Sequence, residues 1–173
     1  MNFSKKLLLP TFINPNKPKA VLTLTKRDSI YGYVINGEQV AEAESIDLHK
    51  TAPIYYGGPL KYDNLKLLHK FPDIETQFHH EFDGIHAFQI CKNVYFGTPT
   101  GLMNIYKREI SKDFMLLSGN LEWTQERLKK EIDYGFWEVE DLANHDIFDR
   151  NAISQLAIQN SRQKLHKIMP SLN

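Results

Sequence analysis

The segment Tyr55-Tyr56-Gly57-Gly58-Pro59 constrains the fold most, because two glycines and a proline directly follow an aromatic pair. Glycine can take a positive φ and lets another backbone approach closely. Pro59 fixes its own φ and disfavours the α region at the residue before it. We therefore predict a strand, a sharp turn at the glycines and an apolar return strand, at residues 52–56, 57–59 and 65–70, with His69 near the end.

The hydrophobic pattern elsewhere predicts further strands and helices. Thr124 and either Asp146 or Asp149 have side chains typical of helix N-caps. Asn36-Gly37 indicates a turn, but residues 38–44 do not alternate cleanly, so a loop or short helix is expected there. A polar connection is expected over residues 71–83. The expected strands are residues 7–9, 20–25, 30–35, 85–91, 94–96, 114–119 (ending at Gly119) and 137–139, and the expected helices are 100–110, 124–135 and one bearing Ile153 to Ile168.

The composition favours a cytoplasmic globular protein without a membrane segment. Lys plus Arg and Asp plus Glu are 21 each, so the net charge is zero, which argues against a general electrostatic grip on nucleic acid. The single cysteine, Cys91, excludes an intramolecular disulfide and is expected to be a buried, inert thiol. No stretch has the length of a membrane span, and the apolar residues before Pro10 are too few for a signal peptide.

The chain of 173 residues is expected to form one domain over residues 1–143 with a packed helical extension over residues 144–173. No acidic residue follows Asp149. The extension is interpreted as a surface helix docked by an apolar stripe, and the alternative is a basic contact surface for a partner or nucleic acid. Its basic residues are Arg150, Arg162, Lys164 and Lys167.

Several segments resemble the YqgE/AlgH family. Gly57-Gly58-Pro59 and His69 match its hallmark fully, and Gly32, Val34 and Asn36 match a second segment. Leu8-Leu9-Pro10, Phe12, Asn14-Pro15, Lys19 and Val21 follow the family's opening outline, and Gly119, Trp123, Leu128, Glu131 and Trp137 its later part. The chain departs from the family at Gly37-Glu38, Asn120, Glu122, Glu126 and Arg127, so it resembles a divergent member.

The resemblance implies an α+β fold, with a bifurcated, mostly antiparallel or mixed sheet curled into a partial barrel and helices packed outside. It also implies a role of the transcriptional-regulator type in one branch of the family. The family motif is expected to shape a pocket or a contact face, and its residues here are Asn36, Gly57, Gly58, Pro59, His69, Gly119 and Trp123.

The residues with catalytic potential do not form a coherent set. His79-His80-Glu81, with His86 nearby, has the side chains that divalent metals prefer, but adjacent histidines point in opposite directions on a strand. His69 is expected to be a hydrogen-bonded structural histidine. We therefore expect no catalytic residue, metal or cofactor, and a binding or regulatory module whose partner is an unknown protein or small molecule. The alternative is a metal-dependent hydrolase or nuclease-like enzyme that uses His69 or the His79 cluster.

Overall fold

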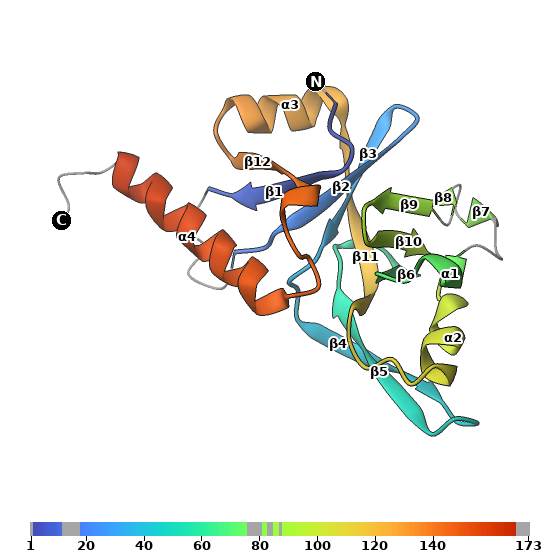
Figure 1. The fold of residues 1–173 in the computed structure, drawn as a ribbon. Coiled ribbons are helices and arrows are strands. Elements are labelled where there is room, and N and C mark those ends of the chain that lie inside the picture. Colours follow the sequence, from blue (N-terminus) through green and yellow to red (C-terminus); the bar gives the residue numbers. More distant parts are fainter. Residues whose placement is uncertain (1, 12–17, 76–80, 83–84, 87, 169–173) are drawn as a thin grey trace. The chain divides into compact units, whose positions relative to one another are not determined.

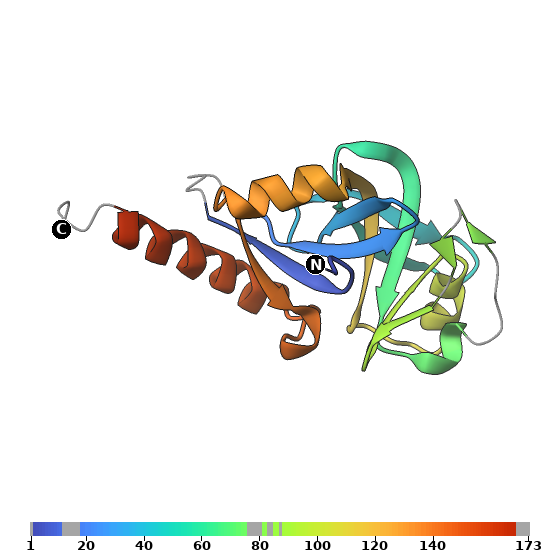
Figure 2. The same cartoon turned by 90° about the horizontal axis from the view of Figure 1, so that it is seen from above.

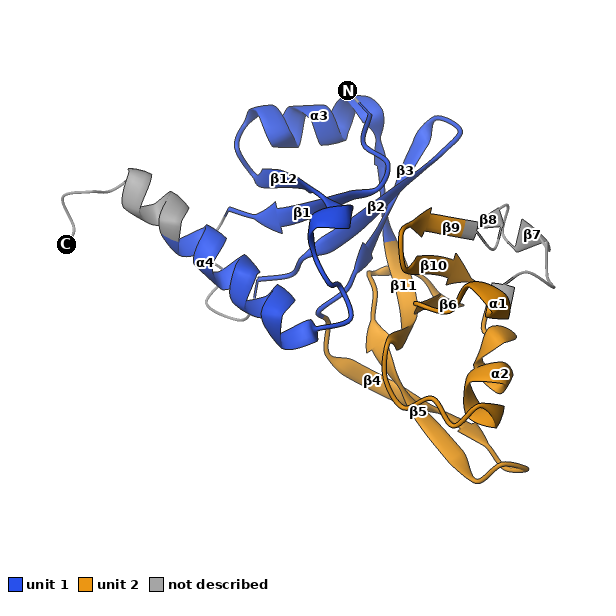
Figure 3. Ribbon diagram, in the orientation of Figure 1, with its two compact units in different colours: residues 1–36, 121–173 blue, residues 37–120 orange. Residues whose placement is uncertain are grey.

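The computed structural model describes residues 2–11, 18–75, 81–82, 85–86 and 88–168. The fold is α+β with a mixed, mostly antiparallel sheet, which confirms the expected class (Figure 1). The chain divides into two compact units, residues 1–36 with 121–173 and residues 37–120 (Figure 3). We call these unit 1 and unit 2. One strand, β11 (Phe114–Thr124), contributes residues to both, and the strand pairing branches along it.

Unit 1 is an antiparallel sheet with helices. Its strand order is β12 (Trp137–Asp141), β1 (Lys6–Pro10), β2 (Val21–Lys26), β3 (Ser29–Val34) and the last residues of β11. Its helical elements are α3 (Gln125–Asp133), the 3-10 turn η1 (Leu142–Asn144) and α4 (Arg150–Ile168). The side chains of Leu7, Leu8 and Leu9 are fully buried, as their uninterrupted apolar run predicts for a central strand.

Helix α4 lies alongside β1 in both ribbon views (Figures 1 and 2). The carbonyl oxygen of Pro10 accepts hydrogen bonds from Ser161 Oγ at 2.9 Å and from Asn160 Nδ2 at 3.1 Å. Asp149 Oδ1 accepts a bond from Ala152 N at 3.0 Å, so the capping role predicted for either of two aspartates falls to Asp149. The helix therefore belongs to unit 1, while the proposed boundary after residue 143 stays a prediction.

Unit 2 is built around the first part of β11. This strand pairs in parallel with β5 (Lys50–Tyr56) and antiparallel with β6 (Leu60–His69). β10 (Val94–Gly97) extends the sheet from β6 and pairs with β9 (Phe88–Cys91). The remaining elements are β4 (Gln39–Ser45), which pairs with β5, the short pair β7 (Glu81–Phe82) and β8 (Ile85–His86), and the helices α1 (Pro72–Glu75) and α2 (Gly101–Lys107).

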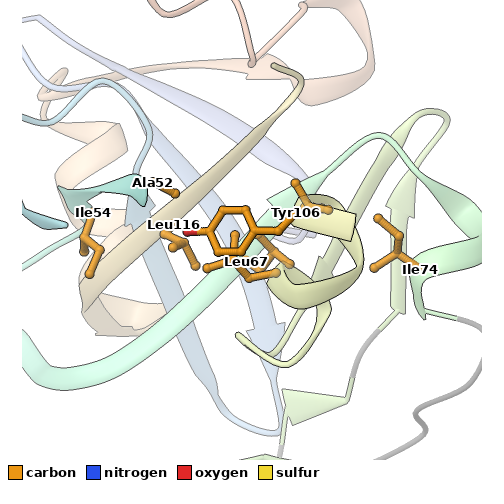
Figure 4. Close-up of a cluster of buried hydrophobic side chains, with 8 residues drawn as sticks. Ala52, Ile54, Leu67, Ile74, Tyr106 and Leu116 are labelled. Carbon is orange, nitrogen blue, oxygen red and sulfur yellow. The ribbon is translucent and has the colours of Figure 1, made fainter. Parts of the chain in front are cut away.

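A cluster of apolar side chains from strands and helices forms a core in unit 2 (Figure 4). Tyr106 of α2 lies in it and donates its hydroxyl to the carbonyl oxygen of Ala43 at 2.9 Å, so its one polar group is satisfied. Burial of these side chains is the main stabilising term for the unit. The cluster consists of Ala52, Ile54, Leu67, Ile74, Leu102, Ile105, Tyr106 and Leu116.

Four predictions of secondary structure were wrong. The return strand expected over residues 65–70 begins at Leu60. Residues 39–45 form β4 rather than a loop or helix, because Ala43 packs against the core while Glu42 and Glu44 face solvent, an alternation that small residues hid. β11 does not end at Gly119 but continues to Thr124 with a shift of register, since Gly119 has φ 84° and bends the strand. The expected polar connection contains α1.

No helix in the described part of the chain is both long and apolar enough to cross a membrane.

Candidate functional site

The Gly57-Gly58 turn crosses the backbone of β11 at very close range. The N–H of Gly57 donates to the carbonyl oxygen of Ser118 at 2.7 Å. Gly58 has φ 152°, and a Cβ placed on it would lie 2.3 Å from the carbonyl carbon of Asn120. A Cβ on Gly119 would lie 2.1 Å from the carbonyl oxygen of Gly58. Side chains are excluded on both sides of this crossing, so the two glycine segments have a structural role.

Apolar side chains are exposed where the chain leaves this crossing. Pro59 is exposed, and Leu60 and Tyr62 keep 43% and 46% of their surface accessible. The ring of the half-buried Tyr56 lies 6.3 Å from that of Tyr62, and Ser118 Oγ donates to the carbonyl oxygen of Tyr62 at 2.6 Å, which holds this part of β6 in place. We call Tyr56, Pro59, Leu60 and Tyr62 the tyrosine face.

The hydroxyl of Tyr56 is in a less polar environment than in water. Burial raises its pKa above the usual 10.0, and the neighbouring Tyr62 and Glu38 raise it further. Tyr56 therefore stays neutral at physiological pH and presents a hydrogen-bonding hydroxyl beside an apolar ring. Such amphipathic aromatic residues are enriched in protein interfaces.

His69 is fully buried at the end of β6. Its ring stacks between those of Phe71 and Tyr95, with centroid distances of 6.1 and 5.6 Å and interplanar angles of 9°. Its Nδ1 accepts a hydrogen bond from the backbone N–H of Phe71 at 3.0 Å, which leaves the other ring nitrogen to carry the proton of a neutral imidazole. The histidine of the family hallmark is thus a structural residue, as expected, and it has no contact with solvent.

Trp123 lies in a compact polar and aromatic cluster of unit 1. Its indole Nε1 donates to Glu131 Oε2 at 2.8 Å, and Trp137 Nε1 donates to the same oxygen at 3.1 Å. The two rings meet edge to face at 6.2 Å. Trp123 is 7% exposed and packs directly over Gly32, so it is a core residue, and the sequence did not indicate that Glu131 would join both tryptophans.

Asn36 connects the ends of two strands to α4. Its Oδ1 accepts from Ala20 N at 2.8 Å, and its Nδ2 donates to the carbonyl oxygen of Pro18 at 3.0 Å and to Ser154 Oγ at 3.3 Å. All of these partners lie in unit 1. The amide is therefore engaged in holding the fold together.

The residues of the expected pocket or contact face lie in different parts of the fold. Gly57, Gly58 and Gly119 meet at the backbone crossing. His69 pairs with Phe114 at the other end of β11's unit 2 segment, while Asn36 and Trp123 belong to unit 1. Sequence reasoning missed Leu60 and Tyr62, although their alternation with Lys61 and Asp63 is a strand signal.

The described side chains contain no group of three His, Cys, Asp or Glu residues arranged to hold an ion. His79 and His80 lie outside the described residues. Cys91 is half-buried rather than fully buried, because the end of β9 is close to the surface.

Comparison with known proteins places the chain in a family. Residues 13–168, most of the sequence, match the family described as DUF179, AlgH-like. The chain belongs to the AlgH-like family. This confirms the resemblance drawn from Gly57-Gly58-Pro59, His69 and the later segments. No curated protein matches the chain significantly.

Two solved structures share the fold of this AlgH-like chain. The solution structure of AlgH from Pseudomonas aeruginosa has 16% sequence identity and a TM-score of 0.62, over 92% of this chain and 87% of that one. The crystal structure of a protein from Corynebacterium diphtheriae has 13% identity and a TM-score of 0.59, over 82% of this chain and 76% of that one. At these identities the likeness concerns the fold alone.

Proposed function

We propose that this AlgH-like protein is a non-enzymatic binding or regulatory module that acts in the cytoplasm and contacts a protein partner through the tyrosine face. The observation that carries the proposal is a contrast within the family motif. His69, Gly57, Gly58 and Gly119 have structural roles, whereas the chain segment that leaves the turn exposes Leu60 and Tyr62.

The chemistry of the face suits a protein partner. Tyrosine and leucine side chains supply apolar area, and two tyrosine rings bring hydroxyl groups to the same place. Buried aromatic residues contribute most of the binding energy in many protein interfaces. The zero net charge gives little affinity for nucleic acid, so any binding of that kind is proposed to be weak and to vanish as salt rises.

A pair of matched variants tests the proposal. Tyr62→Asp places a charge on the tyrosine face, and Tyr134→Asp places one on the 75% exposed Tyr134 of unit 1. Protein captured from native lysate by the wild type should be lost with Tyr62→Asp and retained with Tyr134→Asp. Equal capture by both variants would remove the tyrosine face from consideration.

A further inference from the structure

The edge strand β4 of unit 2 offers a second binding surface, distinct from the tyrosine face. In the part of the chain that the structure describes, β4 pairs with β5 on one side and has no strand on the other. Six of its residues, Gln39 to Glu44, are exposed or half-buried. An edge strand of seven residues is long enough to accept an added strand from another chain.

The orientation of the β4 backbone follows from its partner strand. Glu42 lies opposite Pro53, which has no N–H, so this pair is of the non-hydrogen-bonded kind. The N–H and C=O of Glu42 and Glu44 therefore point away from β5. The hydrogen bond from Tyr56 N to the carbonyl oxygen of Glu38, 2.8 Å long, makes Glu38 and Tyr56 a hydrogen-bonded pair. Counted from that pair, with the bulge between Gln39 and Ala41 included, Glu42 and Pro53 again form a non-hydrogen-bonded pair.

The acidic side chains on this edge favour an added strand that carries basic residues. Residues 38–47 contain Glu38, Glu42, Glu44 and Asp47 and no lysine or arginine. Glu42 and Glu44 are both exposed and, two residues apart, lie on the same face of the strand. An added strand with Lys or Arg at alternate positions would place a cation beside each carboxylate, and such cross-strand pairs are favourable.

A second copy of the chain does not fit this edge equally well. Antiparallel pairing of β4 with another β4 would bring the acidic side chains of both copies together, and like charges across a pair of strands are destabilising. The acidic side chains therefore protect the edge against self-association while leaving it open to a basic strand.

We propose that β4 binds an extended segment of a partner protein by strand addition, with Lys or Arg at alternate positions facing Glu42 and Glu44. Backbone hydrogen bonds from the outward N–H and C=O groups of these residues would supply affinity, and the carboxylates would supply the preference for basic sequences.

The probe is a synthetic peptide with the core Lys-Val-Lys-Val-Lys, labelled for fluorescence polarisation, and its control has Glu in place of Lys. We expect the wild-type protein to bind the basic peptide and not the acidic one, with affinity that falls as salt rises. Amide NMR shifts should concentrate in residues 39–45. Absence of binding, or shifts centred elsewhere, would overturn the proposal, as would pairing of β4 with a second copy in the free protein.

Charge-reversal variants test whether the peptide responds to the carboxylates of β4 or to the net charge of the whole protein. Glu42→Lys with Glu44→Lys should weaken binding of the basic peptide by about ten-fold or more and create binding of the acidic one. The control, Asp28→Lys with Glu126→Lys, makes the same change in net charge at two exposed positions of unit 1. If the control weakens binding as much as the β4 variant, β4 is not the site.

Two further peptides test whether the backbone takes part. N-methylation of the Lys residues blocks one set of N–H groups, and N-methylation of the Val residues blocks the set that faces the other way. One of the two peptides should lose binding and the other should keep it, whereas equal effects would contradict strand addition. Tyr62→Asp should leave peptide binding unchanged, so failure of the tyrosine face and failure of this proposal give different results.

Discussion

The carbonyl oxygen of Gly58 lies only 2.1 Å from the position that a Cβ on Gly119 would take. Real Cβ atoms do not approach a carbonyl oxygen so closely, and neither a backbone carbonyl nor a Cβ, whose position its own backbone fixes, can rotate aside. The turn of the family motif and the bend of β11 therefore require each other.

Substitution at this crossing should be strongly destabilising. Gly58→Ala should lower the free energy of unfolding by more than about 1 kcal/mol, and Gly119→Ala by more than about 3 kcal/mol, because each adds a clash to a strained φ. Gly135 is the control, since its φ is 81° but nothing lies within 4 Å of an added Cβ. Gly135→Ala should therefore report the conformational strain alone, about 1 kcal/mol. Urea denaturation measures all three, and equal losses at Gly119 and Gly135 would contradict the close approach.

Trp123 should contribute as a core residue. Trp123→Ala removes a ring that packs on Gly32 and Trp137 and should cost about 3–5 kcal/mol of stability. In a variant with Trp137→Phe, the remaining Trp123 should fluoresce at shorter wavelength than indole in water. Emission at the wavelength of free indole would show that the ring is solvated.

Glu131 should stabilise the fold through its two indole donors. Glu131→Ala leaves two indole N–H groups without their acceptor and should cost about 2–4 kcal/mol. Glu131→Gln retains an oxygen at the same place and should cost less than half as much. Thermal or urea unfolding would show this order, and similar losses for both variants would mean that the acceptor oxygen is unimportant.

His69 should be inert towards solvent reagents. Its fully buried ring should react with diethyl pyrocarbonate much more slowly than the exposed His49. His69→Phe keeps an aromatic ring between Phe71 and Tyr95 but removes the acceptor for Phe71 N, so it should cost about 1–3 kcal/mol. Rapid modification of His69 in the folded protein would contradict its burial.

Asp73 should make a small contribution to acid sensitivity. The hydrogen bond from Arg108, 2.6 Å long, lowers the pKa of its carboxyl group below the usual 3.8. Because the folded-state pKa is the lower one, the stabilisation is present above the unfolded value and is lost as pH falls through the folded value. Asp73→Asn should therefore reduce the dependence of unfolding on pH below about pH 4 without changing it near neutrality. NMR titration of the Asp73 carboxyl at or above 3.8 would contradict the pairing.

The sequence predicted those elements whose signals are local. The apolar run of β1, the N-cap oxygen of Thr124 that accepts from Arg127 N at 3.1 Å, and the cap at Asp149 all act within a few residues. β4 escaped prediction because its inward positions, Ala43 and Ser45, hold small side chains that bury little apolar surface.

The site was less predictable because its parts come from distant segments. The two glycines before Pro59 indicated a close backbone approach, but nothing local identified Asn120 and Gly119 as the segment approached. Nothing in the helical pattern distinguished Glu131, one oxygen of which accepts hydrogen bonds from two tryptophans. Such contacts depend on tertiary packing, which the pattern of one segment does not contain.

The insertion of residues 37–120 within unit 1 sets an order for synthesis on the ribosome. Every strand of unit 2 has emerged once residue 120 is free of the exit tunnel, so that unit can acquire its core early. β1 emerges before every strand of unit 2, yet it must wait for its neighbour β12 and for α4, more than a hundred residues later. β1 is thus made before unit 2 but fully enclosed after it, and its three consecutive leucines face a long interval in which a chaperone has the opportunity to bind them.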